Sequence, residues 1–246
     1  MFTEKIKPKK PDHPGRRGRG RPRGHTAKGL AARESLYRTA VSLIAERGYE
    51  GTTLRDIADQ AGVSPGLIYK YFPGKRAIVL ALYDELSTEY VSRAERMKPG
   101  PWRERSLFAM KTSLRVLATQ RETLSALVPI LVGDPQKGLF APATDFSRRR
   151  VQQVFIDAVS GAKEKLDEVQ AESLGRILYV VHLAVILWWL LDKSPRQRAT
   201  EGLLELLAKL GPALGLALKL PGAWRTVRSL DALILEGLLG VAPQSH

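Results

Sequence analysis

Apolar residues recur three and four positions apart along most of the chain, and glycines and prolines separate the periodic stretches. The most informative stretch, residues 52–72, holds two short apolar patterns, Leu54-Ile57-Ala58-Ala61 and Leu67-Ile68-Tyr71-Phe72, with Gly62 between them. Glycine takes a left-handed backbone conformation at little steric cost. The pattern therefore predicts two short helices joined by a tight turn.

Polar residues at the ends of both predicted helices support this interpretation. Thr52 or Thr53 supplies a hydroxyl N-cap for the first helix, and Asp56 lies in its first turn, where the helix dipole favours a carboxylate. Ser64 and Pro65 provide an N-cap and a proline at the first position of the second helix. Two short helices that cross in this way form a helix-turn-helix.

The outward residues of the second helix are small, aromatic or basic, namely Ser64, Gly66, Tyr69 and Lys70. Such a face fits the major groove of DNA, although a helix–glycine–helix pattern is also common in all-α proteins that bind no DNA. Lys70 is the single charged residue of this helix, and the sequence contains no Asn. Bidentate Arg–guanine and Asn–adenine contacts are therefore not available from it, and specificity relies on Lys70, on apolar and hydroxyl contacts and on DNA shape.

The stretch AERGYEGTTLRDIADQAGVSPGLIYKYFPGKRAIVLAL, within a region from Tyr37 to about Tyr83, resembles the DNA-binding domain of the tetracycline-repressor (TetR) family of bacterial transcription regulators. The resemblance covers about a fifth of the chain. It implies an all-α fold and double-stranded DNA as the partner. The implied DNA contacts are Thr52, Thr53 and Lys75 at phosphates, Ser64, Pro65, Gly66 and Lys70 at the groove, and Tyr69 and Tyr71 at the backbone or a thymine methyl. The alternative is that one of the two tyrosines is a core residue, and Tyr71 is the stronger candidate for this.

Charge concentrates in an amino-terminal arm. The net charge is +14, and residues 1–28 carry ten basic against two acidic residues, leaving +6 for the rest of the chain. Few apolar residues occur in this arm, so we expect it to be disordered alone. Arg19-Gly20-Arg21-Pro22-Arg23 resembles an AT-hook core, in which Arg19 and Arg21 enter the minor groove of A·T-rich DNA; non-specific phosphate contacts are the alternative.

The rest of the chain reads as helices without strands. The predicted spans are 31–47, 75–97, 102–118, 122–132, 144–161, 167–192, 200–220 and 224–239. The sequence thus predicts three parts: a disordered arm (1–28), a helix-turn-helix domain (29–75) and an all-helical regulatory and dimerisation domain (76–246). Inside the last part the resemblance implies a pocket for a small-molecule effector, with Trp102, Tyr179, His182 and Trp188 as candidate lining residues; plain core positions are the alternative for each.

Two apolar segments predict a homodimer. Residues 167–192 include fifteen consecutive residues, 177–191, that are nearly all apolar, and residues 200–220 have the same character, with leucines at 203, 204, 207, 210, 214 and 218. Fifteen residues are fewer than the about twenty that span a bilayer, so we expect burial against a second copy and no membrane partner. In the resembled family the last long helices of two subunits form the dimer interface. A two-fold pair of reading helices matches two half-sites of a palindromic operator.

Other kinds of chemistry have little support. The chain has no Cys and its four histidines are scattered, so we expect no metal and no cofactor. Gly62-Val63-Ser64-Pro65-Gly66 fits the G-x-S-x-G elbow of serine hydrolases, but that elbow follows a strand and needs a histidine base. No apolar leader follows the basic start, which favours the cytoplasm.

The sequence therefore predicts a ligand-responsive transcription regulator, most simply a repressor, and no enzyme. An architectural binder that coats A·T-rich DNA through the basic arm is the alternative. Deletion of residues 1–28 separates the two, because only the architectural binder would lose all DNA binding.

Overall fold

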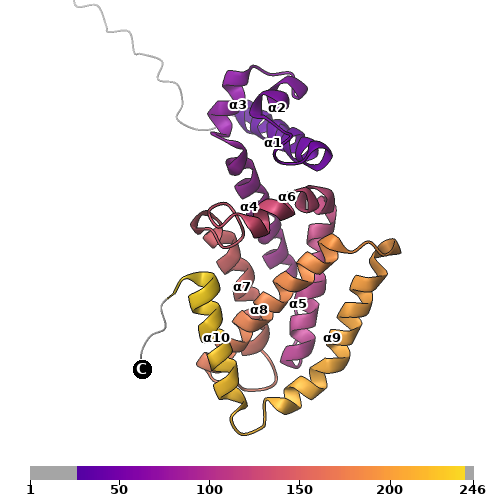
Figure 1. Cartoon of the computed structure of the whole chain (residues 1–246), viewed down its shortest axis with the longest axis vertical. Coiled ribbons are helices and arrows are strands. Elements are labelled where there is room, and N and C mark those ends of the chain that lie inside the picture. The colour runs from indigo at the N-terminus through magenta and orange to yellow at the C-terminus, as the bar shows by residue number, and fades with distance from the viewer. Residues whose placement is uncertain (1–26, 242–246) are drawn as a thin grey trace, which may run out of the picture.

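The computed structural model describes residues 27–241, and these residues form helices and turns without a strand (Figure 1). The helices are α1 (Ala27–Arg47), α2 (Leu54–Gln60), α3 (Pro65–Tyr71), α4 (Lys75–Ala94), α5 (Trp102–Leu117), α6 (Arg121–Gly133), α7 (Asp145–Ser160), α8 (Glu168–Leu191), α9 (Arg198–Ala217) and α10 (Ala223–Leu239). Short 3-10 turns lie at Ala118–Gln120, Pro142–Thr144 and Pro195–Gln197. The predicted all-α class is confirmed, with each helix end within about four residues of its expected position. The arm, including Arg19 and Arg21, lies outside the described residues.

Helices α1, α2 and α3 form a small head at one end of an elongated molecule (Figure 1). Its core consists of fully buried side chains from all three helices, with Leu43 from α1, Ile57 and Ala58 from α2 and Ile68 from α3. The small side chain of Ala58 lets α2 and α3 approach closely, and the amide of Val63 donates to the carbonyl of Ala58 across the turn. The predicted helix-turn-helix is therefore present.

The caps of the two short helices follow the sequence pattern. Thr53 is the N-cap of α2 and forms a capping box with Asp56, in which each side chain accepts a hydrogen bond from the other residue's backbone amide. Gly62 has a φ of +66° and reverses the chain after α2. Ser64 precedes α3 in an extended conformation with Pro65 at the first helical position, but its side chain makes no capping hydrogen bond.

Helix α4 belongs to both parts of the molecule. Its first turns bury Ile78, Val79 and Leu82, while its last turns bury Tyr90 and Ala94 among the body helices. In Figure 1 α4 runs from the head down to α5 and α7. Any movement of the body helices against α4 therefore reaches the head through a continuous helix.

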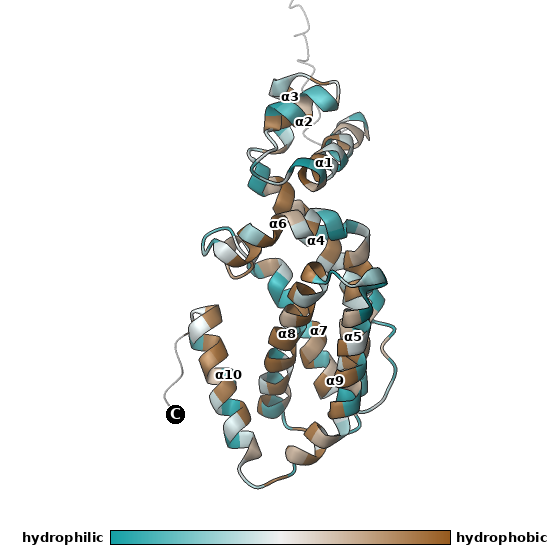
Figure 2. Ribbon diagram, turned by 45° about the vertical axis from the view of Figure 1, so that its right-hand side comes forward, coloured by the Kyte–Doolittle hydropathy of each residue, from teal (hydrophilic) through white to brown (hydrophobic). Residues whose placement is uncertain are grey.

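The body packs α5, α7 and α8 around a common core. Phe155 of α7 and His182 of α8 are fully buried there, with their ring centroids 4.9 Å apart. Helix α9 lies mainly against α5, where Gly211 leaves room for the side chain of Arg103. Helix α10 packs on α8 instead, so that α8 lies between α10 and α9 (Figures 1 and 2).

Helix α8 is longer than the apolar run inside it suggests. It has 24 residues, and an 18-residue window within it has a mean hydropathy of 1.9, so length and composition alone would let it cross a membrane. The core helix of a water-soluble protein passes the same test, and one side of α8 is buried against α7 in this fold. The capping box of Asp167 and Gln170 adds a polar first turn that the count of fifteen apolar residues left out.

The turn at Gly62 gives a stability prediction with an internal control. Replacing Gly62 by Ala places a Cβ on a left-handed residue, so Gly62→Ala should lower the free energy of unfolding by about 1 to 2 kcal/mol. Gly66 lies inside α3 without a positive φ, so Gly66→Ala should raise the free energy of unfolding by about 0.5 to 1 kcal/mol. Neither added Cβ meets another atom within 4 Å. Urea unfolding followed by far-UV circular dichroism measures both; equal effects of one sign would contradict this account of the turn.

Candidate nucleic-acid interface

Helix α3 presents an exposed face at the tip of the head. Ser64, Pro65, Gly66, Tyr69 and Lys70 are all solvent-exposed, and the side chain of Tyr69 is 59% exposed although it is aromatic. Ile68 and Phe72 on the opposite side are buried in the head core. The sequence pattern thus separated the inward and outward residues of this helix correctly.

Tyr71 and Lys70 form a pair at the end of α3. Tyr71 is half-buried, and the ammonium nitrogen of Lys70 lies 5.4 Å from the centroid of its ring. The position is intermediate between the two roles considered for Tyr71, because its ring packs against the head core while its rim stays accessible. The ring also supports Lys70 from one side, which restricts where the ammonium group can point.

Thr52 is not placed to hold a phosphate. Its side chain is fully buried, and its hydroxyl lies 2.8 Å from the carbonyl oxygen of Gly48 and 3.1 Å from that of Leu43. The expectation for Thr52 is therefore wrong, because this hydroxyl ties α1 to the start of α2. Thr53 is exposed, but its hydroxyl donates to Asp56 Oδ2 at 2.7 Å. That hydrogen bond and the one from the Thr53 amide hold the pKa of Asp56 below its usual value.

Lys75 is also directed away from the expected contact. Its ammonium group donates to the carbonyl oxygen of Tyr49 at 2.5 Å and lies 4.3 Å from the centroid of the Tyr49 ring. The carboxylate oxygen Oε2 of Glu50 lies 3.9 Å from the same nitrogen, and the side chain of Lys75 is 21% exposed. Lys75 thus fastens the start of α4 to the turn after α1, a role that spacing alone does not reveal.

Arg55 is a basic residue of this surface that the sequence reasoning missed. It lies in the first turn of α2, next to the capping box, and its side chain is exposed. The amino end of a helix attracts anions, and an arginine there strengthens that attraction. The signal was present in the sequence, since the second position after a threonine N-cap points outward while Leu54 and Ile57 are buried.

The head itself is only mildly basic. Between residues 27 and 75 seven basic residues stand against five acidic ones, a net charge of +2. One of these basic residues, Arg33, packs against an aromatic ring of the head, because its guanidinium carbon lies 5.1 Å from the centroid of the Phe72 ring. Half of the excess positive charge of the chain, +7 of +14, lies in residues 1–26, where the structure gives no placement for Arg19 and Arg21.

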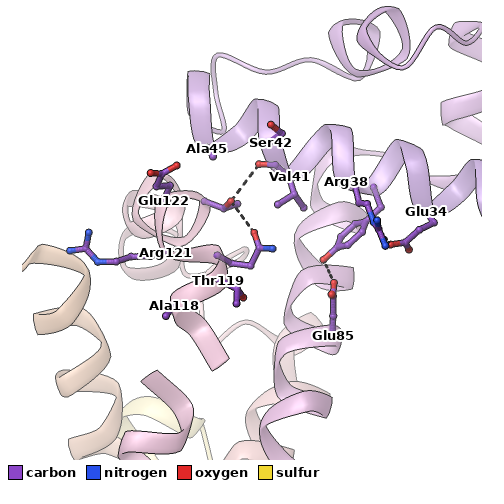
Figure 3. Close-up of a pocket in the computed structure, with 13 residues that line it drawn as sticks. Glu34, Arg38, Val41, Ser42, Ala45, Glu85, Ala118, Thr119, Arg121 and Glu122 are labelled. Carbon is purple, nitrogen blue, oxygen red and sulfur yellow. Dashed lines mark hydrogen bonds and ion pairs between the residues drawn. The ribbon is translucent and has the colours of Figure 1, made fainter. Parts of the chain in front are cut away.

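The head meets the body at a second place besides α4. A cleft of about 810 Å³ lies between α1, α4 and the turn that leads into α6 (Figure 3). At its edges the hydroxyl of Thr123 lies 3.4 Å from the carbonyl oxygen of Val41, and the hydroxyl of Tyr37 donates to Glu85 Oε2 at 2.5 Å. Burial, and then the hydrogen bond to Glu85, raise the pKa of Tyr37, so the phenol stays a donor.

Arg121 connects this junction to α8. Its guanidinium donates to the carbonyl oxygens of Trp189, at 3.1 Å, and of Asp192, also at 3.1 Å, beside the carboxyl end of α8. The guanidinium carbon lies 5.4 Å from the centroid of the Trp189 ring. Figure 3 shows this side chain pointing away from α1, so α6 contacts the head with one side and α8 with another.

The four candidate lining residues of an effector pocket do not lie together. Tyr179 and His182 share the buried side of α8. Trp102 is buried in a separate cluster with Val159, Ala171 and Leu174, while Trp188 is 50% exposed on the outer side of α8. Trp102 and Trp188 therefore do not share one site with His182, because the helical rotation of α8 and the position of α5 separate them.

The buried histidine has an unusual environment. Both ring nitrogens of His182 are buried without a hydrogen-bond partner, and so is the hydroxyl of Tyr90, whose ring stacks at 6.2 Å. Burial lowers the pKa of His182 to about 3, so the imidazole is neutral at physiological pH. Unpartnered buried polar atoms cost free energy and call for an explanation.

The serine-hydrolase reading fails on geometry in this part of the chain. Ser64 lies between helices α2 and α3, whereas a nucleophile elbow follows a strand. His182 is the only histidine within residues 27–241, and it is buried in the body, far along the chain from Ser64. Within the same residues no group of three His, Cys, Asp or Glu side chains is placed to hold a metal ion.

Comparisons with known proteins agree on the head. Residues 36–82 match the family model for bacterial regulatory proteins of the tetR family. The fatty acid metabolism regulator protein of Bacillus subtilis is 43% identical over 56 residues, which are 23% of this chain and 29% of that protein. The repressor KstR2 of Mycolicibacterium smegmatis is 43% identical over 47 residues, 19% of this chain and 23% of that one. The chain thus spans less than a third of the length of these relatives.

Solved structures extend the likeness to the whole fold. A TetR-family regulator from Streptomyces coelicolor has a TM-score of 0.59 at 22% identity, covering 88% of this chain and 91% of that chain. FadR from Bacillus subtilis in complex with stearoyl-CoA has a TM-score of 0.54 at 22% identity, covering 71% of this chain and 97% of that one. At these identities the likeness is one of fold. The helix-turn-helix domain of this chain is thus a domain of the tetR family of bacterial regulatory proteins, and its body has the fold found in regulators of that family.

Proposed function

We propose that the protein is a transcription regulator that binds double-stranded DNA as a homodimer and changes its DNA affinity when a small molecule enters the body. The observation that carries the proposal is the outward face of α3, on which Tyr69 and Lys70 are exposed while Ile68 is fully buried. An exposed tyrosine beside a lysine on a rigid short helix suits a groove better than it suits bulk water.

The proposed DNA contacts follow the placement of the side chains. Ser64, Pro65, Gly66, Tyr69 and Lys70 face the major groove, with Tyr71 supporting Lys70 from the side. Arg55 and the backbone at the start of α2 bind phosphate, in place of Thr52 and Lys75, whose polar groups are already engaged. Because α3 offers one charged group, the basic arm supplies much of the electrostatic affinity.

A homodimer is proposed from the outer side of α8. Toward its carboxyl end this side is apolar, with Ala184, Trp188 and Leu191 exposed and no charged residue between Arg176 and Asp192. Helix α9 adds a stripe of leucines, of which Leu206, Leu210 and Leu214 are about half exposed. The interface predicted at residues 167–192 and 200–220 is thus proposed for α8 and α9, which end at Leu191 and Ala217.

The proposed effector site surrounds His182, Tyr90 and Phe155. These side chains come from α8, α4 and α7, so a ligand that separates them moves α4 directly. The proposed effector is a largely apolar molecule with a hydrogen-bonding group, because such a group would satisfy the imidazole or the phenol while the aromatic rings contact the apolar part. The complex of FadR with stearoyl-CoA is an example of a long-chain ligand held by this fold.

Coupling to DNA is proposed through α4 and through the contact of α6 with α1. An effector shifts DNA affinity only by the difference between its affinities for the two arrangements of the heads. A repressor released by its ligand is the simplest mode of action, and the cytoplasm, where DNA and metabolites meet, is the proposed location.

The DNA-binding proposal predicts a two-part footprint. The full chain should protect a roughly palindromic site with two halves about 34 to 36 Å apart or a multiple of that spacing, and protection should weaken steeply with added salt. Lys70→Ala should weaken binding to this site by about 1 to 3 kcal/mol. The control is Lys111→Ala, which removes an exposed lysine from α5 in the body and should leave affinity unchanged.

Deletion of residues 1–28 distinguishes this proposal from an architectural DNA binder. The shortened chain should bind the same site more weakly and with a smaller dependence on salt. Complete loss of the footprint after deletion, together with no effect of Lys70→Ala, would contradict a reading function for α3.

The buried histidine predicts a pH dependence of stability. The pKa of His182 is about 3 in the folded chain and about 6.5 in the unfolded chain, so below pH 6.5 only the unfolded chain gains this proton. The free energy of unfolding should therefore fall by up to about 1.4 kcal/mol per pH unit as pH decreases from about 6.5. Between pH 7 and pH 5 the loss from His182 should reach about 2 kcal/mol, and His182→Gln should abolish that part. Urea unfolding at both pH values measures it; equal pH dependence in both proteins would show that His182 is not buried as described.

A further inference from the structure

The carboxyl end of α8 is capped by a side chain from another helix. The last carbonyl groups of an α-helix have no partner within the helix, and this end carries partial negative charge. Helix α8 has no basic residue of its own in its last turn. Instead, Nη2 of Arg121, the first residue of α6, lies 3.1 Å from the carbonyl oxygen of Trp189, 3.4 Å from that of Leu190 and 3.1 Å from that of Asp192. The start of α6 is therefore fastened to the end of α8.

The end of α8 is itself held firmly. The side chain of Trp189 is 2% exposed, and its indole nitrogen donates to Oε1 of Gln197 at 2.7 Å. The carboxylate of Asp192 accepts hydrogen bonds from the amide of Thr200 at 2.9 Å and from the hydroxyl of Thr200 at 2.6 Å. Because this carboxylate is engaged at the start of α9, Arg121 is held by carbonyl oxygens and by the Trp189 ring, whose centroid lies 5.4 Å from the guanidinium carbon.

The same turn of α6 contacts the head. Thr123 lies two residues after Arg121 and is buried, and its hydroxyl lies 3.4 Å from the carbonyl oxygen of Val41 in α1. Helix α6 packs on α1 here, while the Arg121 side chain points away from α1 (Figure 3). One turn of α6 thus holds the body with one side and the head with the other.

The carboxyl end of α6 is also joined to the head end of α4. Nη2 of Arg76, in the first turn of α4, donates to the carbonyl oxygen of Gln136 at 2.6 Å, in the loop that follows α6. In Figure 1 α6 crosses the top of the body below the head. Helix α4 alone would let the head swing, because a single helix is a single line of support. The contacts at Val41 and Gln136 restrain the head at two further places.

We infer that Arg121 is a positioning residue for DNA reading, because it joins α6 to the end of α8 and thereby fixes the head above the body. This inference rests on the proposed function, in which α8 is a dimer helix and the place of each head relative to α8 sets the distance between the two heads. That distance selects the half-site spacing that the protein accepts. Loss of Arg121 loosens the head and widens the range of accepted spacings, while the reading face of α3 stays unchanged.

Arg105 provides a matched control. Its guanidinium also donates to three carbonyl oxygens, those of Lys98, Asp157 and Ala158, each at 2.9 Å. Both arginines are half-buried, but Arg105 joins α5 to the end of α7, at the end of the body away from the head (Figure 1). Arg121→Ala and Arg105→Ala should therefore both lower the free energy of unfolding, and only Arg121→Ala should change the placement of the head.

The test measures the distance between head and body in the full chain without DNA. Spin labels are attached at Gln60→Cys on α2 and Lys111→Cys on α5, because both positions are exposed and the chain has no cysteine of its own. Labelled chain is mixed with an excess of unlabelled chain, and the distance distribution is measured by double electron–electron resonance. It should be narrow with no further change and in Arg105→Ala, and broader in Arg121→Ala. Equal distributions in the two variants, whether narrow or broad, would overturn the inference.

A second measurement separates the inference from the proposed function. One base pair inserted between the halves of the protected site should weaken binding of the unchanged protein and of Arg105→Ala more than binding of Arg121→Ala. If Arg121→Ala discriminates between the two sites as well as the unchanged protein, the positioning role is wrong and DNA reading stands. If no site is protected but only Arg121→Ala broadens the distance distribution, DNA reading is wrong and Arg121 still holds the head.

A milder variant keeps the test decisive if the alanine variant fails to fold. Should Arg121→Ala lose its helical circular dichroism, Arg121→Lys replaces it in both measurements. Lysine keeps the charge but lacks the planar guanidinium that spans several carbonyl oxygens and stacks on an aromatic ring. Arg121→Lys should therefore broaden the distance distribution in the same direction, and a distribution as narrow as that of Arg105→Lys would overturn the inference.

Discussion

The structure depends on one helix that is shared by two cores. Helix α4 buries Ile78, Val79 and Leu82 at the head end and Tyr90 and Ala94 inside the body, so neither core is complete without it. Fully buried side chains tolerate little displacement, because interiors are packed to near-crystal density. The orientation of the head relative to the body is therefore set by α4. The contact of α6 with α1 further restricts movement of the head against the body. The proposed effector site, which includes Tyr90, would use this constraint directly.

The reading surface is small, and the rest of the chain compensates for it. Helix α3 has seven residues and offers Lys70 as its one charge, so a single head has little on which to base affinity or selectivity. Two features of the chain supply what is missing. In the proposed function the basic arm raises affinity for any DNA, and a dimer formed through α8 and α9 brings a second head into fixed relation to the first. The proposed dimer and the arm would thus divide selectivity and affinity between them.

Most of the fold followed from apolar spacing and from glycine and proline positions, because these features act locally. The capping box of Thr53, the left-handed Gly62 and the start of α3 at Pro65 are examples, since each depends on two to four neighbouring residues. The failures involve contacts between distant segments. The hydroxyl of Thr52 contacts carbonyl oxygens in α1 and in the turn after it, and the ammonium group of Lys75 donates to the carbonyl oxygen of Tyr49. Trp188 is exposed on the side of α8 opposite to the buried His182. Spacing shows that a side chain is polar or apolar, but only the assembled fold shows which partner it has already found. Arg55 was missed for the opposite reason, since its local signal was readable and was not used.

Photo-crosslinking from α3 to DNA tests the central claim most directly. A benzoylphenylalanine at position 69 in the full-length protein should crosslink to DNA that carries the protected site, and its yield should fall with unlabelled site as competitor. The same residue at position 188, which is similarly exposed in the body, should crosslink to a second protein chain and not to DNA. No DNA crosslink from position 69, or an equal DNA crosslink from position 188, would contradict the account.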